Sequence, residues 1–112
     1  MAHRNLDVLD AAERAAELLN ELIDQSPRGQ LLHVQQMRDS AQSIVANIRE
    51  GFGRRTGRGR ARSLEIARGE TEETIGHLKA NFRAQRIAPK KYWPFHNRYV
   101  VIAKMLSPLL RR

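Results

Sequence analysis

Apolar residues recur at steps of three and four along almost the whole chain, and this period restricts the fold more than any other property of the sequence. Between residues 34 and 50 they form one stripe, made by Val34, Met37, Ala41, Ile44 and Ile48. That spacing places them on one face of a helix that packs along a partner helix. The alternation typical of strands is absent. We therefore expect an all-α protein.

Turn signals divide this pattern into four amphipathic segments. We expect helices at approximately residues 6–25, 30–50, 61–86 and 90–110, because Pro and Gly interrupt the apolar period between them. The intervening segments are short, and short connections favour antiparallel neighbours. The sequence therefore predicts one domain, residues 1–112, folded as an up-down-up-down antiparallel four-helix bundle.

Glycine and proline residues lead to expectations about the helix ends. Gly51 is expected to cap the second helix, and residues 53–59, with Gly53 and two further glycines, are expected to form a flexible, exposed loop. Pro94 has no backbone donor, so we expect the last helix to start irregularly between Pro89 and Pro94, with Trp93 exposed or covered by a neighbour.

The charge of the chain is uneven as well as positive. The net charge is +8; residues 1–27 hold two basic and six acidic residues, whereas residues 28–112 hold 18 basic and six acidic ones. A basic balance of this size favours polyanions, mainly nucleic acid, through phosphate contacts and counterion release. General solubility, or pairing between an acidic first helix and basic neighbours, is the alternative interpretation.

A cluster of arginines supplies the candidate nucleic-acid-binding residues. Five lie within nine positions, and two lysines would extend the positive surface if the ends of the bundle cooperate; these residues are Arg54, Arg55, Arg58, Arg60, Arg62, Lys90 and Lys91. Arginines in a glycine-containing loop can bind phosphates along an irregular RNA or a single strand. Aromatic residues for base stacking are limited to Phe52, Tyr92 and Trp93. The alternative is a solvated loop.

A polar stripe runs beside the apolar one and is made by Gln36, Ser40, Ser43, Asn47 and Glu50. Ser43 and Asn47 are one turn apart, and Glu50 follows at the next step. We expect them to form hydrogen bonds between helices that set the register of the bundle, the alternative being a ligand or subunit contact. Glutamates of residues 61–86 are expected to pair with arginines of the second helix and the loop.

The sequence lacks the residues that several kinds of catalytic and metal-binding site require. The chain has no Cys, which excludes disulfides, thiol catalysis and Cys-ligated zinc. Glu73 and His77 form one pair where a di-metal bundle needs two, and no Gly-Lys-Ser/Thr phosphate loop is present. We expect a non-enzymatic protein without metal or cofactor. With no signal-peptide core and no apolar run near ~20 residues, we expect it to be cytoplasmic.

The run Ser43-Ile44-x-x-Asn47-Ile48-x-Glu50-Gly51-x-Gly53-Arg54 resembles a known family. It is similar to the four-helix-bundle proteins encoded in intervening sequences of bacterial large-subunit ribosomal RNA genes (IVS proteins). Ala67-x-Gly69 followed by Glu73 matches the family's third helix, although Glu70 stands where Ser is usual. The matching positions outside the core are Ser43, Asn47, Glu50, Gly51, Gly53 and Glu73.

The resemblance implies a ring-shaped homo-oligomer, typically a pentamer, with nucleic acid as partner and no enzymatic activity. Accessory variability proteins of diversity-generating retroelements look similar in fold. We therefore expect a basic bundle that binds nucleic acid, RNA favoured and without sequence specificity, through the arginine-rich loop. The alternative is a scaffold module that docks an acidic protein partner such as a reverse transcriptase or another polymerase.

Overall fold

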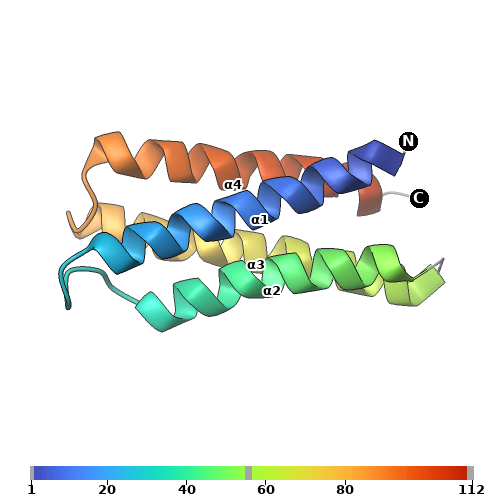
Figure 1. Ribbon diagram of the computed structural model, residues 1–112, viewed down its shortest axis with the longest axis horizontal. Coiled ribbons are helices and arrows are strands. Elements are labelled where there is room, and N and C mark those ends of the chain that lie inside the picture. Colours follow the sequence, from blue (N-terminus) through green and yellow to red (C-terminus); the bar gives the residue numbers. More distant parts are fainter. Residues whose placement is uncertain (1, 55–56, 111–112) are drawn as a thin grey trace.

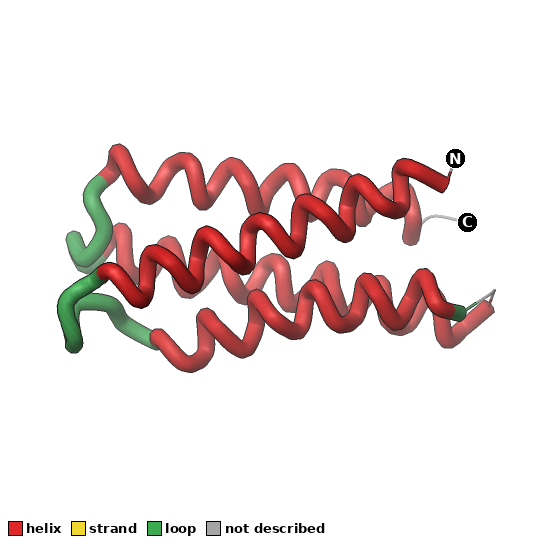
Figure 2. Tube along the Cα trace, viewed as in Figure 1, coloured by secondary structure: helices red, strands yellow, loops and turns green. Residues whose placement is uncertain are grey.

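Four long helices make up the protein, as seen in a computed structural model that describes residues 2–54 and 57–110 (Figure 1). They are α1 (Ala2–Gln25), α2 (Val34–Gly53), α3 (Gly57–Arg83) and α4 (Pro89–Leu110). The described residues contain no strand, and short loops join the helices (Figure 2). The all-α expectation is confirmed, and α1 begins at Ala2 rather than near residue 6.

Each helix packs against two neighbours, in an up-down-up-down arrangement. α2 lies between α1 and α3, and α4 closes the bundle by packing on both α3 and α1. The bundle is a rod of 44 × 22 × 19 Å. The end of α2, the start of α3, the start of α1 and the end of α4 lie at one end of this rod, and the α1–α2 and α3–α4 connections lie at the opposite end (Figure 1).

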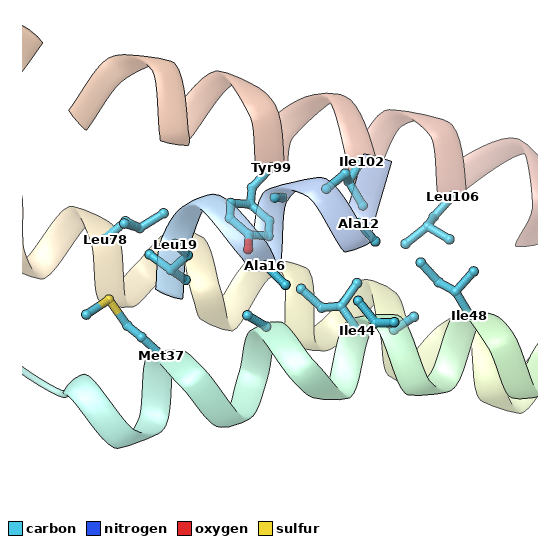
Figure 3. Packing of buried hydrophobic residues seen from close by; sticks show 14 of the residues in the cluster. Ala12, Ala16, Leu19, Met37, Ile44, Ile48, Leu78, Tyr99, Ile102 and Leu106 are labelled. Carbon is cyan, nitrogen blue, oxygen red and sulfur yellow. The ribbon is translucent and has the colours of Figure 1, made fainter. Parts of the chain in front are cut away.

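The core follows the apolar stripes predicted from the period. Figure 3 shows side chains from all four helices meeting inside the bundle, among them Leu19, Met37, Ile44, Leu78 and Ile102. α1 contributes small residues at the centre of its buried face, where Ala12 and Ala15 are 1% and 0% exposed, respectively. The small volume of alanine lets α1 approach its neighbours closely.

A residue of α3, and not one of α1 or α2, holds the connection between α1 and α2. The Asn81 amide accepts a hydrogen bond from the Leu32 backbone N–H (2.7 Å) and donates one to the Leu32 carbonyl (3.1 Å). His33 follows in the left-handed conformation, with φ of 58°. Because the backbone of Leu32 is bonded to Asn81, α2 begins at Val34 and the expected start near residue 30 is wrong.

The connection between α3 and α4 is a Schellman turn, the bonding pattern that often ends helices. The Arg86 N–H donates to the Asn81 carbonyl (2.8 Å), and the N–H of Gln85 donates to the Phe82 carbonyl (3.0 Å). Gln85 takes the left-handed conformation, with φ of 60°, at the position where glycine is usual. Gln30 and Arg86 exchange side-chain-to-backbone hydrogen bonds, which joins the two connections at this end.

The region predicted to be a glycine-rich loop is mostly helical. α2 continues through Gly51 to Gly53, so the expected cap at Gly51 is wrong. α3 begins already at Gly57, so the loop expected over residues 53–59 is wrong at residues 53 and 57–59, while residues 55 and 56 lie outside the described part of the chain. Gly51 is buried, and a Cβ added to it would lie 2.9 Å from Leu64 Cδ2. The absence of a side chain at Gly51 therefore lets α2 pack closely on α3.

The expected irregular start of α4 is also wrong. α4 begins at Pro89 and continues through both Pro94 and Pro108. The first four N–H groups of a helix have no partner within it, so Pro94, one turn further on, removes only one early hydrogen bond. Trp93 is 47% exposed, as one of the two expected alternatives stated.

Candidate nucleic-acid interface

Four of the five clustered arginines lie on ordered helix ends. Arg54 is the C-terminal cap of α2, and Arg58, Arg60 and Arg62 occupy the first turns of α3. Arg55 lies outside the described residues. We call Arg54, Arg58, Arg60 and Arg62 the arginine end. The four described arginines therefore lie on the adjoining ends of two helices, not on the long loop that the sequence predicts.

Two residues of the arginine end already have partners. Arg54 donates a hydrogen bond of 2.9 Å to the Glu50 carboxylate, and its side chain crosses over Gly59, where a Cβ would lie 2.7 Å from Arg54 Cδ. The Arg60 guanidinium lies over the Phe52 ring, 5.3 Å from its centroid. This cation–π contact leaves the Phe52 face covered by the protein's own arginine.

Arg58 and Arg62 are the arginines free to contact a ligand. Both are exposed, and within residues 2–54 and 57–110 neither makes a side-chain hydrogen bond or an ion pair. They are four positions apart on α3, so their side chains leave the same face of the helix. Two guanidinium groups on one face can bind successive phosphates or a pair of carboxylates.

The start of α3 adds a positive partial charge to this end. Its first N–H groups have no partner within the helix, and its first turn holds no acidic residue to neutralise them. A surface hollow of about 370 Å³ opens here, lined by Gly57, Arg58, Arg60, Ala61 and Leu109. Guanidinium groups, a helix N-terminus and a hollow together favour anions.

Lys90 and Lys91 are not part of the arginine end. Both are exposed in the first turn of α4, which starts at the opposite end of the 44 Å rod (Figure 1). Within one chain the two basic groups therefore cannot form one surface, and the expected extension is wrong for a single subunit.

Other arginines are paired with the acidic residues of α1. Arg38 donates to Asp24 (2.6 Å) and to Asn20 (2.7 Å), and Arg49 forms an ion pair with Glu13. The alternative interpretation of the charge, pairing between α1 and basic neighbours, therefore holds for α2. It does not extend to Arg58 and Arg62.

The glutamates of α3 do not pair with arginines of α2 in the described residues. Arg68 and Glu72, both on α3, approach to 3.9 Å, and Glu73 lies 3.5 Å from His77. Burial, and to a lesser extent the nearby Glu73 carboxylate, raises the pKa of Glu70. The predicted pairing between helices is therefore wrong for the described residues, and Arg55 lies outside them. The middle of α3 stays acidic.

Two members of the polar stripe of α2, Ser43 and Asn47, do not bridge helices. The Asn47 amide donates to the Ser43 carbonyl (2.9 Å) and to the Ser43 hydroxyl (3.1 Å), both within α2. The buried hydrogen bond between helices instead joins Ser40 Oγ to Thr74 Oγ1 at 2.7 Å. The hydrogen bond between helices that was expected for Ser43 and Asn47 is therefore made by Ser40, another member of the same polar stripe.

Two polar contacts near the α1–α2 and α3–α4 connections were not predicted from the sequence. Asn81, fully buried, bonds the Leu32 backbone, and His33 Nδ1 lies 3.1 Å from His77 Nδ1. A polar residue one turn after Leu78 on a buried face was the available signal for Asn81. The histidines are far apart in sequence, so nothing local indicated their contact.

Metal sites and membrane spans are two other features that a helical bundle can carry. Across residues 2–54 and 57–110, no three His, Asp or Glu side chains converge as metal ligands would. None of the four helices is long and apolar enough, in its described residues, to cross a membrane.

The fold and its charge define a basic, antiparallel four-helix bundle. Residues 4–108 match the family model of the 23S rRNA-intervening sequence protein, so the chain belongs to that family. A crystal structure from Bacteroides thetaiotaomicron VPI-5482, a protein of unknown function from the S23 ribosomal protein family, superimposes with a TM-score of 0.90 at 25% identity. The match covers 97% of this chain and 99% of that one. No curated protein matches the chain significantly.

Proposed function

We propose that the protein is a non-enzymatic bundle that binds nucleic acid, RNA in preference, through the phosphate backbone at the arginine end. The observation that carries this proposal is the position of Arg58 and Arg62, which are exposed, unpaired among the described residues and one turn apart at the start of α3. Residues 51–64 contain no acid that would repel phosphates. Membership of a family named for 23S rRNA intervening sequences supports the choice of RNA.

A few arginines per subunit bind phosphates weakly, so the proposal includes a homo-oligomer, a pentameric ring by family resemblance. Repeating the arginine end around a ring turns each further contact into an intramolecular event and raises the overall affinity. Light scattering on the purified protein measures the assembly directly. A monomer at micromolar concentration would contradict this part of the proposal.

The second candidate is a protein-interaction module that docks an acidic partner such as a polymerase. The same geometry favours it, because guanidinium groups bind carboxylates as readily as phosphates. The two candidates differ in their response to free RNA. A docking module should bind one protein partner saturably and show little affinity for RNA.

The test compares two double variants over a salt series, with labelled single-stranded RNA and duplex DNA as ligands. Arg58→Gln with Arg62→Gln removes the unpaired charges, and Arg38→Gln with Arg49→Gln removes the same charge from arginines that pair with α1. For single strands the log–log salt slope should fall by ~0.7 for each phosphate that the variant no longer binds. We expect this decrease only in the first variant.

The outcomes separate the candidates. An equal decrease in both variants would mean that net charge alone drives binding, and the arginine end would have no special role. A flat salt response by the wild type would contradict nucleic-acid binding and direct the search to acidic protein partners. Thermal unfolding of each variant controls for stability, since exposed ion pairs contribute only ~0–1 kcal/mol.

A further inference from the structure

An aromatic cluster occupies the end of the bundle opposite the arginine end. The Phe82 ring of α3 stacks on the Tyr92 ring of α4, with centroids 4.1 Å apart and planes inclined by 7°. Trp93 packs edge-on against Phe82 (5.7 Å), Tyr92 (4.9 Å) and His96 (5.1 Å). These edge contacts hold the indole in one orientation.

Trp93 differs from its neighbours in exposure. Tyr92 is 1% exposed, whereas Trp93 is 47% exposed. The cluster therefore buries one part of the indole and presents the rest to solvent in a fixed position. A rigid, half-exposed aromatic ring is what a stacking platform for a nucleobase requires.

The charge around Trp93 is positive. Lys90 lies one turn before it on the same face of α4, and Lys91 and Arg83 are exposed nearby at the same end. Glu73 is the last acid in the sequence, so α4 and its connection to α3 contain none. Asp24 reaches this end from α1 but is paired with Arg38.

A hollow adjoins the cluster at the junction of α3 and α4. It measures about 460 Å³ and is lined by Phe82, Arg83, Gln85, Ile87, Ala88 and Pro89. Phe82 lines the hollow and also belongs to the aromatic cluster, so the two adjoin each other. The combination offers an apolar surface for a ring and cations for the phosphates beside it.

We infer that Trp93 is a second binding element, on which an unpaired base of single-stranded nucleic acid stacks while Lys90, Lys91 and Arg83 bind the adjoining phosphates. A duplex buries the faces of its bases, so this site takes unpaired strands. The inference rests on the proposed function only in assuming a nucleic-acid partner, because it uses none of the residues of the arginine end.

The emission of Trp93 tests the inference, since it is the only tryptophan of the chain. A short oligouridylate, whose bases do not stack on one another, serves as the probe. A duplex RNA of the same length and a polyphosphate chain supply charge without free base faces. We expect the oligouridylate to quench most of the emission and the two controls to leave most of it.

Two variants add an affinity measurement that does not depend on fluorescence of the protein. Trp93→Leu should weaken oligouridylate binding, measured by anisotropy of a labelled strand, by about fivefold to a hundredfold. Trp93→Phe keeps a smaller aromatic face and should lose less. Because Trp93 is half-exposed, both variants should keep the helical circular dichroism of the wild type.

The outcomes distinguish this inference from the proposed function. The oligouridylate could bind without quenching Trp93 emission and with the same affinity for Trp93→Leu as for the wild type. That result would overturn the inference and leave the proposed role of the arginine end intact. If the double variant Arg58→Gln with Arg62→Gln still shows quenching and binds with unchanged affinity, the inference is supported and the proposed role of the arginine end is contradicted. Emission that shifts with protein concentration alone, and not with RNA, would place a second copy on Trp93 and overturn the inference.

Discussion

Gly51 of α2 and Leu64 of α3 lie so close that a Cβ on Gly51 would be 2.9 Å from Leu64 Cδ2 and 3.0 Å from its Cγ. Leu64 is fully buried, so its side chain has no room to withdraw. The contact brings the last turns of α2 against the first turns of α3. It therefore positions the arginine end.

Gly51→Ala should destabilise the protein by about 1–3 kcal/mol, because the added methyl overpacks the contact with Leu64. Gly53→Ala is the matched control, since a Cβ at Gly53 meets no atom of the described residues within 4 Å. That change should be neutral or stabilising by up to ~1 kcal/mol, as expected for Gly→Ala in a helix. Urea unfolding measures both, and equal effects would refute the packing role of Gly51.

Asn81→Ala should cost about 2–4 kcal/mol, because it leaves the N–H and carbonyl of Leu32 without their partner in a partly buried site. Asn47→Ala removes the same side chain from a site where the amide bonds only its own helix. We expect that control to lose less than about 1 kcal/mol. Similar losses from the two variants in chemical denaturation would show that Asn81 does not hold the α1–α2 connection.

Gln85→Gly should stabilise the protein by about 1 kcal/mol, because a residue with a Cβ is strained in the left-handed conformation and glycine is not. Gln85→Ala keeps the strain and serves as control, with little change expected. Thermal unfolding of the three proteins gives the ranking. A loss of stability in the glycine variant would mean that the Gln85 side chain makes a contact that outweighs the strain.

Tyr99→Phe should leave stability at neutral pH unchanged or raise it by up to ~1 kcal/mol. The Tyr99 hydroxyl is buried and has no hydrogen-bond partner among the described residues, and Figure 3 shows its ring directed from α4 into the core. Removing the oxygen removes a desolvated group without leaving another one unpaired. A loss above about 2 kcal/mol would indicate a hydrogen bond to this hydroxyl.

The same residue predicts a loss of stability in alkali. Burial raises the pKa of Tyr99 above its usual range, an effect that the nearby Arg98 charge only partly offsets. The unfolded chain ionises its tyrosines near pH 10, whereas folded Tyr99 keeps its proton. The contribution of Tyr99 to stability is therefore constant below about pH 10 and falls above it. In Tyr99→Phe this fall should be shallower, leaving the part due to Tyr92, whose pKa burial also raises. Identical alkaline profiles would contradict this assignment.

The helices and their order could be predicted from the sequence, because an apolar period of three and four depends only on residues close together in the chain. Ile44, Leu78 and Leu106 are buried as their positions in the period require. The topology also separates Lys90 from Arg58, since the fourth helix of an up-down bundle starts at the end opposite the α2–α3 connection. That consequence was available from the predicted fold.

The end of α2 and the start of α3 could not be predicted, because one residue type serves several physical purposes. Glycine ends helices, and it also permits close packing, as at Gly51, or a positive φ, as at Gly57. Only the position of Leu64, a residue of the neighbouring helix, distinguishes these uses at Gly51. The hydrogen bonds between the Asn81 side chain and the Leu32 backbone likewise join residues 49 positions apart. Local signals carry no information about such pairs.

The distribution of charge along the rod limits how a polymer can lie on one subunit. Positive side chains dominate both ends, and the middle of α3 carries Glu65, Glu70, Glu72 and Glu73. A strand that runs along α3 between the two ends of the 44 Å axis passes these carboxylates, whereas a strand that runs along α4 meets no acid on that helix. At ~3.4 Å per nucleotide of helical strand, that span corresponds to on the order of ten nucleotides. Oligonucleotides below this footprint can occupy only one end of a subunit, so affinity should rise in a step, rather than smoothly, as the strand is lengthened.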